Sequence, residues 1–187
     1  SLEEKQNLAV QAAQEFWKLD IIDPSSKDHS ERAIRGLVFI DSVIRTKAGL
    51  DWGWETEYKG DGDFAWCGAF VAACYAKSGL LLKYRNQDIA STYRLDRWAQ
   101  GISSKGGGCQ VTMDDSKVRG YCRCESADVI KAFEPRPGDI LLVGDKGYGH
   151  HITLIESVTY EEGLPVICTI EGNGYGRFPD GSSGQGV

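Results

Sequence analysis

The chain lacks a long apolar run, an excess of basic residues and a leader-like start. The longest apolar runs are short, such as Ile140 to Val143, so none could span a bilayer. There are 21 Lys and Arg residues against 27 Asp and Glu, a net charge of −6, which disfavours a nucleic-acid partner because such binding depends on phosphate neutralisation. The first ten residues have no basic segment followed by an apolar one and do not resemble a signal peptide.

Length and composition are those of an ordinary globular protein. The 187 residues are 41% apolar and 26% charged, so we expect residues 1–187 to form a single domain. The six cysteines are too few for a disulfide scaffold of this length but enough for one or two bridges or a metal site. They are Cys67, Cys74, Cys109, Cys122, Cys124 and Cys168.

Helical patterns occupy the first half of the chain. Apolar spacing predicts helices over residues 2–19 and 31–46, and a third within 63–80 that stops at Ser78-Gly79. The first is expected to bury Leu8, Ala9, Ala12, Ala13, Phe16 and Trp17. The second is expected to begin with a capping box of Asp28 and Glu31 and to bury Ile34, Leu37, Val38, Phe39 and Val43.

Strand patterns follow from Pro137 onward. The runs PGDILLV, HITLIESV and LPVICTI are β-rich and separated by turn residues, which predicts an α+β fold with an antiparallel sheet. Between the two halves we expect a short helix around residues 92–99 and a polar excursion over 104–127. The Gly/Ser-rich end after Pro179 is expected to be frayed.

Cys67 is the first candidate for chemistry. It lies about one turn into the third predicted helix, where the partial positive charge of a helix N-terminus favours a thiolate. A working nucleophile also needs an imidazole. His29 lies in a polar loop and is interpreted as a solvated surface residue, whereas His150 and His151 open a β-run. Because side chains alternate along a strand, one of these two faces the helix.

A third group is needed to orient the imidazole. If the next strand pairs with the histidine strand through the turn at 161–163, its end brings Glu171 or Asn173 near the ring. The alternative is a buried cysteine with two exposed histidines. Cys74, two turns deeper in the helix, and Cys168, within an apolar strand, are both expected to be buried core residues.

Four motifs in order resemble the CHAP amidase/peptidase family, relatives of the NlpC-type cell-wall peptidases. They are WCGAFV, PGDILLV, GHHITLIESV and TIEGNG, and the segment WAQG resembles a further element of that family. The resemblance covers residues 60–175 and implies a papain-like fold, with the nucleophile helix packed on an antiparallel sheet. Residues 1–50 match nothing in the family and are expected to form an added helical layer.

By position, the resemblance implies that Cys67 is the nucleophile and that Glu171 and Asn173 orient the histidine and polarise the site. Counting back along the strand makes His151 the catalytic histidine, although the family more often has glycine where His150 stands. The implied activity is hydrolysis of a peptidoglycan amide bond, either muramoyl–alanine or a stem or cross-bridge peptide.

The implied place of action is extracellular, periplasmic or at the cell wall, as a lysin, an autolysin or a delivered toxin with an immunity or inhibitor protein as partner. Two alternatives stay open. One is a cysteine protease or transacylase of the same fold with a non-wall substrate. The other is a non-catalytic binding domain in which Cys67 is inert.

No cofactor is expected. Cys109, Cys122 and Cys124 lack a fourth zinc ligand at convincing spacing, so a disulfide from Cys109 to one of the other two is favoured over a zinc site. Calcium binding, known among relatives in the family, has candidate ligands here. They are Glu57, Asp61 and Asp63, for which a polar loop with Asp63 as a helix cap is the favoured alternative.

Overall fold

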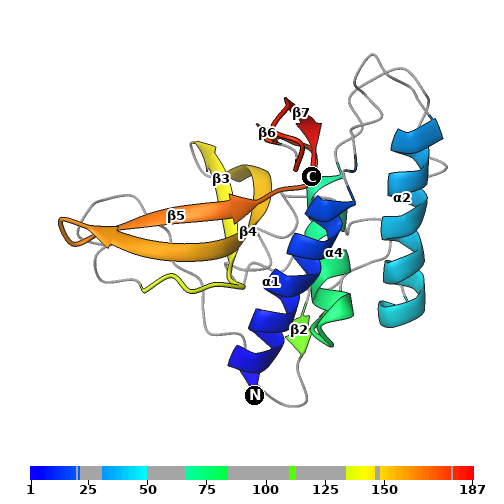
Figure 1. The fold of residues 1–187 in the computed structure, drawn as a ribbon. Coiled ribbons are helices and arrows are strands. Elements are labelled where there is room, and N and C mark those ends of the chain that lie inside the picture. The colour runs from blue at the N-terminus through cyan, green and yellow to red at the C-terminus, as the bar shows by residue number, and fades with distance from the viewer. Residues whose placement is uncertain are drawn as a thin grey trace.

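The computed structural model describes residues 1–19, 21, 31–49, 66–83, 110–112, 134–145, 148–177 and 179–187. The helical elements are α1 (Leu2–Lys18), α2 (Glu31–Val43), a π-helical turn η1 (Ile44–Ala48) and α4 (Cys67–Lys77). The strands are β1 (Leu81–Lys83), β2 (Gln110–Thr112), β3 (Ile140–Asp145), β4 (Tyr148–Glu161), β5 (Leu164–Ile170), β6 (Gly174–Arg177) and β7 (Ser183–Gly186). Every described strand pair is antiparallel, so the predicted mixed α+β class is confirmed (Figure 1).

Helix α4 is the centre of the structure. All residues from Cys67 to Ala76 are buried, as expected for a helix that is apolar on every side. Helices α1 and α2 lie on either side of it, and strand β4 also contacts it (Figure 1). Gly79 has a left-handed φ of 79°, which ends the helix where the sequence predicts. Residues 1–50, expected as an added layer, thus contribute α1 and α2 to the same core as α4.

The start of α4 differs from the prediction. Cys67 is its first helical residue, with Trp66 at the N-cap position, and is not one turn into the helix. Trp66 is fully buried and provides no side-chain cap. The placement matters chemically, because the first four N–H groups of a helix have no partner within it.

Helix α1 presents one small-residue face to α4. Ser1 and Glu4 form a capping box at its start, and Ala9, Ala12, Ala13 and Phe16 are buried as predicted. Leu8 is exposed, so its predicted burial was wrong. Leu8 lies beside the alanine stripe of α1. The small alanines let α4 approach α1 closely along that stripe only.

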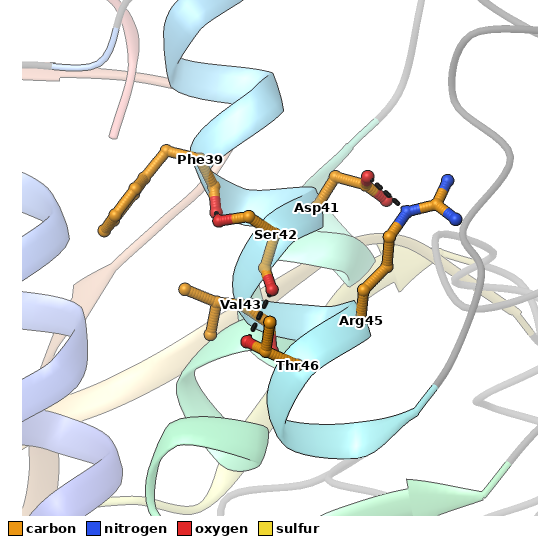
Figure 2. Close-up of polar contacts among 6 residues, drawn as sticks. All are labelled: Phe39, Asp41, Ser42, Val43, Arg45 and Thr46. Atoms are coloured by element: carbon orange, nitrogen blue, oxygen red, sulfur yellow. Dashed lines mark hydrogen bonds and ion pairs between the residues drawn. The ribbon is translucent and has the colours of Figure 1, made fainter.

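Helix α2 passes into η1 where hydroxyl side chains bond to its carbonyls (Figure 2). The Ser42 hydroxyl donates to the Phe39 carbonyl at 2.8 Å, and the Thr46 hydroxyl donates to the Ser42 carbonyl at 2.6 Å. An ion pair of 2.6 Å joins Arg45 of η1 to Asp41 of α2. Hydroxyls bonded back to the preceding turn commonly accompany such local changes in helix geometry.

The buried side of α2 is formed by Leu37 and Ile40 and continues at Ile44 in η1. Val38 and Phe39 are exposed, so their predicted burial was wrong. A spacing of three and four residues selects a narrow stripe, and these two residues lie beside it.

The main sheet has the strand order β3-β4-β5. The predicted hairpin between β4 and β5 is confirmed, with positive φ at Glu162 (50°) and Gly163 (78°) in the turn. A register shift follows Ile155, and Leu154 pairs with Ile170 near the base of the hairpin. The far half of the hairpin extends beyond the helices (Figure 1).

The Pro-Gly-Asp turn before β3 lies between α1 and α4. Gly138 has a φ of 85°, and a Cβ there would lie 2.5 Å from Gln6 Cβ and 2.8 Å from the Gln6 carbonyl oxygen. The Tyr75 hydroxyl donates to the Gly138 carbonyl at 2.6 Å, and Gln6 Nε2 donates to Asp139 Oδ1 at 2.7 Å. The motif is therefore structural, since only glycine fits this close approach.

The segment after Pro179 is ordered, and the expectation of a frayed end was wrong. Strand β7 pairs with β6. Val187 is buried in the main core, and its N–H donates to the Ile21 carbonyl at 3.0 Å. These backbone bonds and the burial of Val187 oppose the fraying that glycine and serine favour.

Several predicted features lie outside the described residues. These are the cap at Asp28, the helix around 92–99, most of the 104–127 excursion, and Glu57, Asp61, Asp63, Cys109, Cys122 and Cys124. Within the described ranges, no helix combines the length and apolar character needed to cross a membrane.

Candidate active site

The site is built on the first residue of α4. Cys67 is only 2% exposed, and the buried Trp66 precedes it. Its backbone N–H belongs to the helical turn whose donors have no intrahelical acceptor. The thiol and a backbone donor are thus held together at one end of the central helix.

His151 is held near the beginning of β4. It pairs with Val143 of β3, and the four residues that follow it, 152–155, are buried, with Ile152 and Leu154 in the same core as α4. Its Nε2 lies 3.1 Å from Glu171 Oε2, and the two side chains are 26% and 34% exposed. The β4–β5 hairpin therefore places the carboxylate at the histidine ring, as its predicted pairing required.

Cys67 and His151 interact directly. The pKa of His151 is raised to about 9, first by a hydrogen bond to the Cys67 side chain and then by the hydrogen bond to Glu171, while burial opposes the rise. Because Glu171 occupies Nε2, Nδ1 is the ring nitrogen left for the thiol. Three side chains from distant parts of the sequence therefore form one chain of contacts, from sulfur through imidazole to carboxylate.

Glu171 has a second partner that the sequence analysis missed. The Thr169 hydroxyl donates to Glu171 Oε1 at 2.7 Å. The pKa of Glu171 is lowered, first by its hydrogen bond to His151 and also by the one to Thr169, while burial opposes this. The available signal was the two-residue spacing, because Thr169 and Glu171 lie on the same side of one extended segment.

No protein-family model, curated protein or solved structure matches this chain. Its chemistry is therefore argued from the geometry of its own residues. A thiol, an imidazole and a carboxylate that contact one another in this order can provide a nucleophile, a proton donor and acceptor, and a group that orients the ring.

Gly172 is the other site residue that sequence reasoning missed. A Cβ at this position would lie 2.3 Å from Phe70 Cβ and 3.0 Å from Trp66 Cζ3. The turn after β5 therefore rests directly on α4, one residue from Glu171. A glycine between two candidate site residues was the signal, since glycine permits close approach of a backbone.

Asn173, the other candidate for orienting the histidine, lies in the same turn with a φ of 60°. Its Oδ1 is buried and has no hydrogen-bond partner in the part of the chain that the structure describes. The structure thus shows a hydrogen bond between Glu171 and His151, whereas the Asn173 side-chain oxygen makes none among the described residues. The side chain of His150 lies outside the described set.

The remaining described cysteines do not join this site. Cys74 is fully buried in the core as predicted, and burial raises its thiol pKa. Cys168 is exposed, so its predicted burial was wrong. It lies on the same face of β5 as Ile170, and burial on that face is confined to Ile170 at the end of the strand. Cys67, Cys74 and Cys168 form no disulfide.

The described residues contain no group of three or more His, Cys, Asp or Glu side chains that could hold a metal ion. The calcium candidates lie outside this set.

Proposed function

We propose that this chain is a cysteine amidase or endopeptidase that hydrolyses an amide bond of peptidoglycan through a thioester. The observation that carries the proposal is the contact series from Cys67 through His151 to Glu171. The family resemblance of residues 60–175 supplies the substrate class, the papain-like relationship and action at the cell wall.

In the acylation step, the Cys67 thiolate attacks the amide carbonyl carbon and a C–S bond forms. The backbone N–H of Cys67 donates to the oxyanion of the tetrahedral intermediate. His151 transfers its proton to the leaving nitrogen as the C–N bond breaks. With a pKa of about 9, His151 carries this proton at neutral pH.

In the deacylation step, His151 acts as a base. The largest cause of its raised pKa is the contact with Cys67, and a thioester sulfur is uncharged. The pKa of His151 therefore falls once the sulfur is acylated, so the ring that has given its proton to the departing amine stays neutral and is available to accept a proton from water. Water adds to the carbonyl, the C–S bond breaks, and the thiolate and imidazolium return.

The decisive experiment is digestion of purified peptidoglycan followed by mass analysis of the fragments. We expect wild-type protein and the Cys168→Ala control to release fragments cut at one type of amide bond, and Cys67→Ala to release none while keeping its fold. Full activity of folded Cys67→Ala would overturn the mechanism. Absence of wall cleavage by a protein with an active thiol would overturn the substrate class.

Alkylation tests the thiol without a substrate. Iodoacetamide at neutral pH, with labelling resolved by peptide mass analysis, compares Cys67 with the exposed Cys168 and the buried Cys74. We expect Cys67 to react fastest despite its burial, because the thiolate is the reactive form, and Cys74 to remain unlabelled. Labelling of Cys168 alone would support an inert Cys67.

A further inference from the structure

We propose that Thr169 is a positioning residue for this site, holding the Glu171 carboxylate so that its second oxygen faces His151. The expected effect on catalysis rests on the proposed function. The orientation of Glu171 toward His151 does not depend on that function.

The two oxygens of one carboxylate have different partners. Oε1 accepts the Thr169 hydroxyl at 2.7 Å, and Oε2 lies 3.1 Å from His151 Nε2. The Glu171 side chain is 34% exposed, so without a second contact its terminal torsion could turn an oxygen toward solvent. Fixing Oε1 also fixes the direction of Oε2, because both oxygens belong to one planar group.

The turn after β5 also limits the positions that the Glu171 carboxylate can take. A Cβ at position 174 would lie 2.6 Å from Glu171 Oε2 and 2.9 Å from Glu171 Cβ. The backbone of Gly174 therefore lies close to the side chain. Thr169 and the Gly174 backbone together restrict the conformations of Glu171, one by a hydrogen bond and one by sterics.

The orientation of Glu171 affects His151. Among the described residues, the charged or ionisable groups that contact the His151 ring are Cys67 from α4 and Glu171 from the segment after β5. If Glu171 loses its fixed direction, the imidazolium keeps the thiolate contact but its interaction with the carboxylate weakens. The ring is then less well aligned for both proton transfers, whereas the Thr169 hydroxyl is engaged by Glu171 and is not expected to bind substrate.

The test compares Thr169→Val, which is nearly isosteric but has no hydroxyl, with Thr169→Ser, which keeps the hydroxyl. Thr159→Val, on an exposed position of β4, is the matched control. The first readout is an NMR titration of the imidazole, with the resonance assigned by its loss in His151→Asn. The second is the pH profile of kcat and KM on the wall fragment that wild-type protein cleaves.

In Thr169→Val we expect the His151 pKa to fall below about 9 and kcat to fall about tenfold with KM little changed. Thr169→Ser and Thr159→Val should match wild-type protein in both readouts. If the valine variant does not fold, Thr169→Ala removes the same hydroxyl without the branched methyl groups.

The inference is overturned if removal of the hydroxyl leaves the His151 titration unchanged, or if Thr169→Ser is as impaired as Thr169→Val. The NMR arm separates this failure from failure of the proposed function. An inactive wild-type protein would still show the displaced His151 titration in Thr169→Val if the positioning role is correct.

Discussion

Replacing Glu171 by glutamine should make the stability of the protein less dependent on pH. The pKa of His151 is raised from 6.5 to about 9, which corresponds to about 3 kcal/mol at about 1.4 kcal/mol per pKa unit. The contact with Cys67 is the larger cause, and solvent screens the partly exposed ion pair with Glu171. We therefore assign to Glu171 about 1 kcal/mol of this stabilisation.

The pH window follows from the directions of the two pKa changes. Because folding raises the pKa of His151, its contribution is full below about 6.5 and is lost as the pH rises through about 9. Folding lowers the pKa of Glu171 from 4.5, so its contribution is present above that value and is lost as the pH falls through the lower value in the folded protein. The two contributions are therefore both full between about pH 4.5 and 6.5, and the one from His151 declines above that window.

Urea unfolding at a series of pH values measures this directly. The free energy of unfolding of wild-type protein should exceed that of Glu171→Gln by about 1 kcal/mol between about pH 4.5 and 6.5. The difference should shrink toward zero at alkaline and acidic pH. Glu161→Gln, at the exposed end of the hairpin, is the control and should show no such window. A difference between wild type and Glu171→Gln that stays constant across the whole range would refute the proposed coupling.

Two further predictions concern how the site is held. Gly172→Ala should lower the free energy of unfolding by about 1–3 kcal/mol, measured in urea, because its methyl group would lie 2.3 Å from Phe70 Cβ; an unchanged midpoint would contradict the close approach. Tyr75→Phe should cost about 1–2 kcal/mol of thermal stability, because the buried Gly138 carbonyl loses its donor, and a melting temperature equal to that of wild type would argue against this bond.

The sequence predicted the part of the site that depends on local patterns. The turn residues Glu162 and Gly163 define the hairpin, and the hairpin alone determines that Glu171 ends beside the start of β4. The helix that begins at Cys67 followed from its apolar composition and its stop at Gly79. Local chemistry was sufficient in each case because the deciding contacts are close in sequence or directly across one strand pair.

The features that the sequence did not predict depend on which other elements cover a given face of a strand or helix. Alternation along β5 places Cys168 on the same side as the buried Ile170, yet only Ile170 lies beneath the helices. Likewise, the segment TIEGN carries the two-residue spacing behind the Thr169–Glu171 hydrogen bond, but it does not reveal that Gly172 rests on Phe70. That contact depends on the relative positions of elements far apart in the chain.

Enclosure of α4 has a consequence for how the proposed activity would be lost. The Cys67 sulfur is fixed to the first residue of a helix that is buried from Cys67 to Ala76, so it stays in place as long as that packing is intact. Heating a protein with the proposed activity should therefore leave each molecule either competent or unfolded, and the residual rate of a heated sample would count its surviving native molecules.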